Sequence, residues 1–95
     1  MASNFLIFSH RNSDNLHLKL MGDFDGSSAY QLINILKEQK GNVNNIFIHT
    51  CNLSSMDPFG VEVFQKSSSV NFLSDRLTFT GEYSDEMALE GSSLA

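Results

Sequence analysis

The nine-residue segment from Asn52 to Gly60, NLSSMDPFG, restricts the fold more than any other part of this sequence. The apolar run Ile46–Ile48 comes shortly before it, and a new stretch of periodic apolar residues follows it. Aspartate is a preferred N-cap residue, and proline suits the first helical position because its missing N–H needs no partner there. We therefore predict a buried strand that ends in a loop, with Asp57 as the N-cap and Pro58 as the first residue of a helix.

The length and composition indicate one domain, residues 1–95. Of these 95 residues, 41% are apolar, which is too rich for a disordered chain and ordinary for a globular one. The formal net charge is −5, and the six Lys and Arg residues are scattered along the chain. Because proteins that bind nucleic acid need clustered basic residues for the phosphates, we expect no nucleic-acid partner.

The sequence also bears on the compartment. Its one cysteine, Cys51, has no second cysteine for an internal disulfide, which suits a reducing environment. No charged segment precedes a long apolar run at the N-terminus, and no apolar run approaches the roughly twenty residues that span a bilayer. We therefore expect a soluble cytoplasmic protein that does not insert into membranes.

The first part of the chain is predicted to form an antiparallel hairpin. Asn4–His10 has a strand pattern with apolar side chains on both faces, and the leucines of Leu16–Met21 alternate with other residues. Between these strands, Arg11–Asn15 is dense in turn-forming residues. Two strands joined by a short polar turn favour antiparallel pairing.

The first helix is predicted to follow a loop at Gly22–Gly26. Ser28 and Gln31 have the spacing of a capping box, in which each side chain satisfies a backbone N–H of the other residue. Apolar residues then recur at helical spacing and form one stripe: Ala29, Leu32, Ile33 and Leu36. Gly41 is placed to end this helix.

The second half is predicted to continue the alternation of strand and helix. Asn45–Cys51 contains consecutive apolar residues, as expected for a central strand covered on both faces. A strand–helix–strand order implies a right-handed crossover and parallel pairing. The remaining predicted elements are a helix from Pro58 to Val70 or Phe72, interrupted by serines, a strand at Leu77–Thr80 and a short helix at Ser84–Leu89.

Three blocks of the sequence together resemble a STAS domain, the fold of bacterial anti-sigma-factor antagonists and of the cytoplasmic tails of sulfate transporters. The blocks are Leu18–Ala29 (LKLMGDFDGSSA), Asn52–Gly60 and Leu77–Leu89, in the order and spacing of that family. The resemblance implies an α/β fold in which a mixed central sheet of four to five strands has two to three helices packed on one face.

The resemblance also implies a non-catalytic protein-interaction module without a cofactor. In the family, a kinase phosphorylates the serine that follows the aspartate, and the phosphate adds nearly two negative charges to the docking surface. Here Pro58 occupies that position and Phe59 the next, and neither residue has a hydroxyl group. We therefore expect a constitutive or otherwise regulated binder, with Ser55 as the remaining candidate for phosphorylation.

The resemblance places a docking face on two segments of this chain. Its candidate partner-binding residues are Asp25, Gly26, Ser27, Ser28, Ser54, Ser55, Met56, Asp57, Pro58, Phe59 and Gly60. The implied partner is an anti-sigma kinase, a stress-signalling assembly or a transport ATPase, of which the chain would then be an accessory subunit for lipid transport. Capping is the alternative role for Asp57, and packing beneath the preceding loop is the alternative for Phe59.

The residues leave two other classes of protein open. His49 and Cys51 share a strand face that His17 can join, which suggests a zinc or nucleophile site of a small enzyme. The absence of CxxC or HxxxH spacing favours ordinary half-buried sheet residues and no metal. Asp23 and Asp25 are interpreted as solvated turn residues rather than metal ligands. A self-assembling subunit, such as a homodimer, is the other class.

Overall fold

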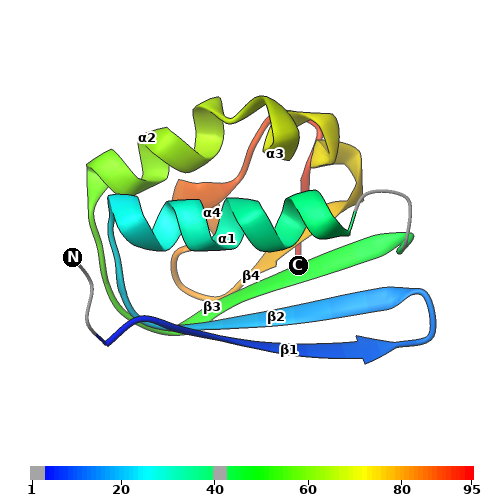
Figure 1. Ribbon diagram of the computed structural model, residues 1–95, viewed down its shortest axis with the longest axis horizontal. Helices are drawn as coiled ribbons and strands as arrows, with labels where there is room; N and C mark the ends of the chain where they lie inside the picture. The colour runs from blue at the N-terminus through cyan, green and yellow to red at the C-terminus, as the bar shows by residue number, and fades with distance from the viewer. Residues whose placement is uncertain (1–3, 40–42) are drawn as a thin grey trace.

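The computed structural model describes residues 4–39 and 43–95. Their strands form one five-stranded sheet in the order β1-β2-β3-β4-β5 (Figure 1). The elements are β1 Leu6–Asn12, β2 Asn15–Phe24, α1 Gly26–Glu38, β3 Asn45–Met56, α2 Pro58–Lys66, α3 Ser68–Phe72, a 3₁₀ turn Ser74–Arg76, β4 Leu77–Thr80, α4 Ser84–Met87 and β5 Ser93–Leu94. The predicted α/β fold with a mixed central sheet is confirmed.

Strand pairing follows the predicted hairpin and crossover. β1 pairs antiparallel with β2 through a two-residue turn, in which Ser13 adopts a left-handed φ of 57°. β2, β3, β4 and β5 are mutually parallel. The parallel order brings the carboxyl ends of β2 and β3 to the same edge of the sheet.

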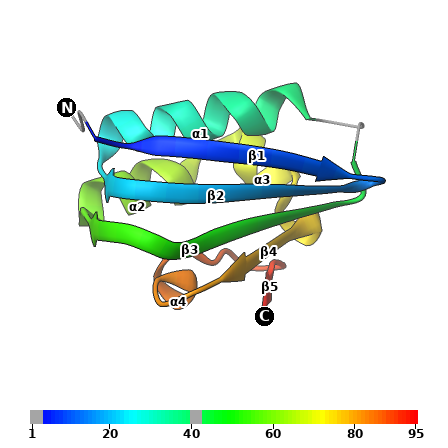
Figure 2. The ribbon, with the colours of Figure 1, turned by 90° about the horizontal axis from the view of Figure 1, so that it is seen from below.

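Helices α1, α2 and α3 cover one face of the sheet, and the core lies between them and the strands (Figures 1 and 2). All four residues of the predicted stripe on α1 are buried. Phe64 of α2 packs its ring edge-on against Phe24 of β2 and Phe79 of β4, with centroid separations of 6.3 Å and 6.0 Å. Burial of each such side chain contributes about 1.5–3 kcal/mol, so this row of rings holds α2 on the sheet.

β3 contains a β-bulge and extends beyond the predicted end of the strand. Thr50 and Leu53 are both buried, while Cys51 and Asn52 between them are exposed, so one residue of β3 is extra at this point. A second register shift, between Leu53 and Ser55, adds one more residue to β3. Beyond the bulge β3 continues to Met56 beside the end of β2. The predicted loop at Gly22–Gly26 is therefore wrong, because Gly22–Phe24 pair with β3, Asp25 is the N-cap and Gly26 begins α1. The predicted end of the strand at Cys51 is also wrong, because β3 pairs with β2 as far as Met56.

The N-terminus of α1 also differs from the prediction. Asp25, not Ser28, is the N-cap, and its carboxylate accepts the backbone N–H of Ser28. Gln31 is exposed and takes no part in a capping box with Ser28 as cap. The helix ends at Glu38 with Gln39 as its C-cap, whereas the predicted stop at Gly41 lies outside the described residues.

The predicted second helix is two helices. α2 ends at Lys66, Ser67 has an extended backbone, and the Ser67 hydroxyl caps α3 by accepting the N–H of Val70 at 3.5 Å. The Asn71 amide donates to the carbonyls of Gln65 and Ser67, at 2.9 Å and 2.8 Å, and thereby satisfies backbone groups freed by the break.

The last helix, α4, ends at Met87 and is two residues shorter than predicted. Among the described helices, none is long and apolar enough to cross a membrane.

Candidate docking site

Two strand–helix junctions lie side by side at one edge of the sheet (Figure 1). β2 is followed by Asp25 and α1, and β3 is followed by Asp57 and α2. Because Phe24 pairs with Met56, the two aspartates are neighbours, and the Asp57 N–H donates to the Phe24 carbonyl at 2.8 Å. The structure thus brings together the two segments, 25–28 and 54–60, that the sequence suggested separately.

Glycines allow the starts of α1 and α2 to touch. A side chain added to Gly60 would place its Cβ 2.7 Å from the carbonyl carbon and oxygen of Asp25. A Cβ on Gly26 would lie 2.9 Å from Cε2 of the Phe59 ring. Real Cβ atoms essentially never make contacts below 3.0 Å. Gly60 must therefore be glycine, because its neighbour is backbone, whereas a Cβ at Gly26 would require the exposed Phe59 ring to shift.

Asp25 organises the start of α1. Its Oδ1 atom accepts hydrogen bonds from the Ser27 hydroxyl at 2.9 Å and from the Ser28 N–H and hydroxyl at 3.0 Å and 3.1 Å. The backbone N–H of Ser28, and then the Ser27 hydroxyl, hold the pKa of Asp25 below its usual value. Ser28 itself is fully buried, and the one proton of its hydroxyl is shared between Asp25 Oδ1 and the nearer Asp23 carbonyl, at 2.8 Å. These residues form the scaffold beneath the site.

Asp57 and Pro58 begin α2 as predicted. The Asp57 Oδ1 atom accepts the N–H of Phe59 at 3.1 Å, and Pro58 occupies the first turn. Both side chains are exposed. The capping role of Asp57 is therefore confirmed, and its exposed carboxylate leaves recognition of a partner as a compatible second role.

The Phe59 ring is a prominent apolar feature of this edge. It is 61% exposed and lies against Gly26, so it is not packed beneath the preceding loop. Tyr30, one turn beyond Gly26 on α1, lies on the same side of that helix and is 60% exposed. Sequence reasoning missed Tyr30, although its place outside the buried stripe of α1 was a signal that it faces solvent.

Ser54 and Ser55 are exposed at the end of β3, and Met56 is half-buried. The Ser55 hydroxyl donates to the Asp23 carboxylate at 2.6 Å. A phosphate on Ser55 would replace this hydrogen bond by repulsion between two anions. Phosphorylation at Ser55 would therefore remove this side-chain link between β3 and β2.

The residues of the alternative enzyme interpretation lie elsewhere, on the face of the sheet that α1, α2 and α3 do not cover. His17 Nδ1 and His49 Nε2 are 3.0 Å apart, and His49 Nδ1 is 2.7 Å from the Thr80 hydroxyl. Both ring nitrogens of His49 make hydrogen bonds, so neither nitrogen of this ring is available as a base for the thiol of Cys51, which is exposed at the bulge. Over residues 4–39 and 43–95, no group of three or more His, Cys, Asp or Glu side chains is arranged to hold a metal ion.

Comparison with known proteins supports the fold. No family model matches the chain, and no curated protein matches it. Among solved structures, a serine-to-glutamate variant of RsbS from Moorella thermoacetica superposes with a TM-score of 0.65 at 21% identity, over 98% of this chain and 86% of that one. The anti-sigma factor antagonist SpoIIAA, in its unphosphorylated form, superposes with a TM-score of 0.60 at 18% identity, over 82% and 73% of the two chains.

A third solved structure has the same arrangement of elements. It is an uncharacterised protein with a SpoIIAA-like fold from Shewanella loihica, with a TM-score of 0.60 at 17% identity, over 86% of this chain and 72% of that one. At these identities the similarity shows the fold. The chain thus has the STAS-like fold of the anti-sigma factor antagonist SpoIIAA.

Proposed function

We propose that this chain is a non-catalytic STAS-type signalling module that binds a protein partner through the edge where α1 and α2 begin. The docking surface comprises Asp25–Ser28, Tyr30 and Ser54–Gly60. One observation carries this proposal: Phe59 is exposed at the contact between the two helix starts, where a glycine lies beneath its ring. Aromatic anchors of this kind supply much of the binding energy at protein interfaces.

Charge near the docking surface favours a basic partner. Asp57 is exposed beside Phe59, and a groove of about 350 Å³ along α2 has Glu62, Glu86 and Lys66 in its lining. Lys66 pairs with Glu62 at 2.7 Å, so Asp57 and Glu86 leave this surface with a net negative charge. The wall of this groove includes Met56 and Pro58, so it is continuous with the docking surface. A partner with basic residues around an apolar pocket would match both features, because complementary charge speeds encounter and an apolar pocket holds the aromatic ring.

Binding at this surface is not switched by phosphate at Pro58, since proline offers no oxygen to a kinase. The neighbouring Phe59 offers none either. We therefore propose that the chain binds constitutively or is regulated through another residue. The family resemblance makes an anti-sigma kinase or a stress-signalling assembly the first class of partner, and a lipid-transport ATPase the second.

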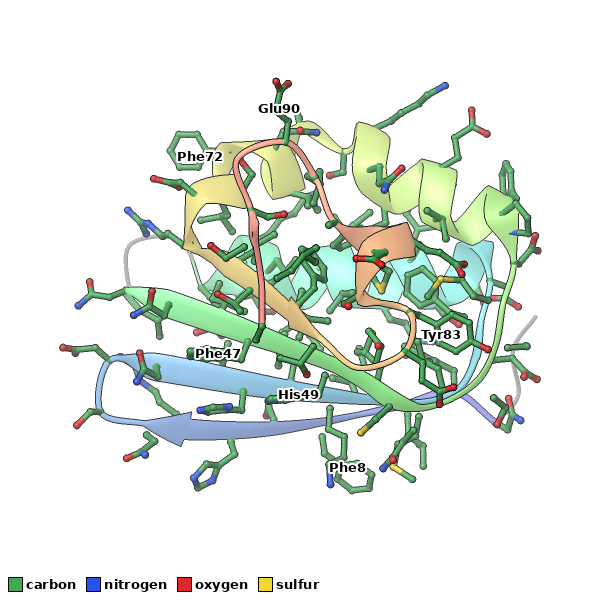
Figure 3. All side chains as sticks on the ribbon, turned by 180° about the vertical axis from the view of Figure 1, so that it is seen from behind. Phe8, Phe47, His49, Phe72, Tyr83 and Glu90 are labelled. Atoms are coloured by element: carbon green, nitrogen blue, oxygen red, sulfur yellow. The ribbon has the colours of Figure 1, made fainter. Side chains whose placement is uncertain are left out.

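The test compares Phe59→Ala with a matched control, Phe72→Ala. Phe72, at the end of α3, is 68% exposed, so both substitutions remove an exposed aromatic ring from a helix and leave the core unchanged (Figure 3). Tagged wild-type protein and both variants would be used to isolate partners from the source cells, and the affinity of the purified partner would then be measured. We expect Phe59→Ala to weaken binding more than about tenfold and Phe72→Ala to leave it unchanged.

Equal affinity of all three proteins for every partner would contradict the docking surface. Recovery of the partner from the membrane fraction together with an ATPase would favour the lipid-transport class. Recovery of a kinase from the soluble fraction would favour the anti-sigma class. The affinities of the variants test which surface binds, and the fraction from which the partner is recovered tests the class of partner.

A further inference from the structure

The open face of the sheet carries an unusual set of side chains. Along β1, β2 and β3 the residues that alternate with the core point away from the helices, as Phe8 does in Figure 3. This face holds all three histidines of the sequence together with a lysine and apolar side chains: Phe8, His10, His17, Lys19, Met21, Phe47 and His49.

His17 and His49 form one flat unit. Their ring nitrogens are hydrogen-bonded at 3.0 Å, the ring centroids are 5.3 Å apart and the planes differ by 2°. Since nitrogen lone pairs lie in the ring plane, a hydrogen bond between parallel rings at this separation requires them to lie edge to edge rather than face to face. The two imidazoles therefore form a continuous plate, which we call the imidazole plate.

Contacts with β3 and β4 hold the plate on the open face of the sheet. The Thr80 hydroxyl of β4 binds His49 Nδ1 at 2.7 Å, and the Thr80 carbonyl accepts the hydroxyl of buried Thr50 at 2.8 Å. Phe47 stacks on His17 with centroids 4.8 Å apart and planes 10° from parallel. This stacking covers one face of the plate and fixes its orientation.

The opposite face of the plate borders a hollow. In the parallel register His17 pairs with Phe47 and Lys19 pairs with His49, so the His17–His49 bond runs diagonally between Phe47 and Lys19. The hollow has a volume of about 500 Å³ and is lined on the Lys19 side by Phe8, Ser9, His10, His17, Lys19, Met21, His49 and Asn52. This volume is within the range of small-molecule sites, roughly 300–1,000 Å³.

The chemistry of the lining defines the ligand. Lys19 supplies a fixed positive charge, and none of the eight lining residues is acidic. Phe8, which is 55% exposed, and Met21 supply apolar surface facing the plate. A flat ring can stack on the plate, since aromatic rings prefer offset-parallel contact, and an attached anion can pair with the ammonium group.

We propose that this hollow binds a small planar aromatic carboxylate, with its ring stacked on the imidazole plate and its carboxylate paired with Lys19. The site is separate from the docking surface, since it lies on the face of the sheet opposite α1 and α2. The proposal therefore stands whether or not the docking surface binds a partner.

The test uses 2-naphthoate as the probe, with the purified protein observed by isothermal calorimetry and by amide chemical shifts. Saturable binding is expected, with the largest shifts at His17, Lys19 and His49. Lys19→Gln should weaken the affinity for 2-naphthoate at least tenfold, whereas neutral 2-naphthamide should bind more weakly and respond little to this substitution. Lys37→Gln is the matched control, because Lys37 is an exposed lysine on α1 outside the hollow.

In the binding experiment, any one of three results would overturn the proposal: no saturable binding of 2-naphthoate, affinity unchanged by Lys19→Gln, or shifts confined to other parts of the chain. Sedimentation equilibrium of the free protein is the companion measurement. A dimer that Phe8→Ala dissociates would show that a second copy occupies the open face, and would also overturn the proposal. Because Lys19 and Phe8 are exposed, both variants should keep the amide spectrum of the folded protein.

Discussion

Two aspartates occupy equivalent positions in this molecule and perform different tasks. One carboxylate oxygen of Asp25 accepts three hydrogen bonds, from the Ser27 hydroxyl and from the N–H and hydroxyl of Ser28. Ser28 is buried. Asp57 accepts one backbone N–H, from Phe59, and is exposed. The first residue holds the junction together, while the second presents a carboxylate at the proposed interface. Loss of Asp25 would therefore affect folding, and loss of Asp57 would affect capping and, under the proposed function, recognition of a partner.

The charge on Asp25 should make stability depend on pH. Its folded pKa is below the unfolded value of about 3.9, so the unfolded chain takes up the proton first as the pH falls. The contribution of the ionised carboxylate is thus complete above the unfolded pKa and is lost as the pH falls through the folded pKa. Urea unfolding should show wild type more stable than Asp25→Asn at neutral pH, with the difference disappearing in acid. Asparagine is an equally good N-cap, so a difference that stays constant with pH would contradict this role of charge.

At the scale of elements, the contact between α1 and α2 depends on the absence of side chains. Alanine normally favours a helix over glycine by about 1 kcal/mol. At Gly60 the added Cβ would meet backbone atoms of Asp25 at 2.7 Å, and backbone cannot move aside as a flexible side chain can. The clash should outweigh the helix propensity.

We therefore expect Gly60→Ala to destabilise the protein by about 1–3 kcal/mol, as overpacking does elsewhere. Denaturant unfolding measures the change in the free energy of unfolding. Ser68→Ala, at an exposed position in α3, is the control and should change stability by less than about 0.5 kcal/mol. A stabilised Gly60→Ala variant would mean that the two helix starts are not in contact.

The sequence predicts the elements better than it predicts their ends. The stripe on α1, the hairpin and the junction at Asp57–Pro58 follow from periodicity and capping, which are local. The extension of β2 and β3 to Phe24 and Met56 depends on pairing between segments distant in the chain, which polar sequences such as Ser54-Ser55 conceal. For the same reason the two halves of the proposed docking surface were suggested by resemblance, whereas Tyr30 and the His17–His49 bond appear only in three dimensions.

The pairing of β2 with β3 also sets the titration of His49. Burial, then the nearby charges of His17 and Lys19, lower the pKa of His49 from its usual value near 6.5. His10 on β1 also lies near His17, with ring centroids 6.4 Å apart, and Thr80 contacts His49 from β4. A positive charge on His17 or Lys19 disfavours protonation of the His49 ring.

The folded state therefore binds fewer protons at His49 than the unfolded state does between the folded pKa and about 6.5. Stability should fall as the pH drops through this window and then level off below the folded pKa. His49→Gln should remove this part of the pH dependence, as measured by urea unfolding at a series of pH values. The matched variant His10→Gln changes an exposed histidine and should leave the His49 dependence in place. A wild-type profile identical to that of His49→Gln would exclude a lowered pKa.

At the scale of the whole molecule, one sheet separates two surfaces of different character. The helical side ends in an acidic edge with an exposed aromatic ring, and the open side has a lysine and three histidines over an apolar hollow. The net charge of −5 thus conceals an uneven distribution. The core of buried leucine, isoleucine and phenylalanine side chains lies between the helical layer and the sheet and makes a rigid separation, because close-packed interiors do not deform continuously.

This separation predicts that the two surfaces act independently. Lys19→Gln should weaken 2-naphthoate binding and leave partner affinity unchanged, and Phe59→Ala should do the reverse. Because the two residues share no contact, the stability changes of the double variant should equal the sum of the single changes within about 0.5 kcal/mol. Titration of the partner with and without saturating 2-naphthoate is the decisive measurement. A change in partner affinity would require the ligand to bind two states of the protein differently. We would look for such a second state at the β3 bulge at Cys51 and Asn52, because this strand connects the hollow with the proposed docking surface.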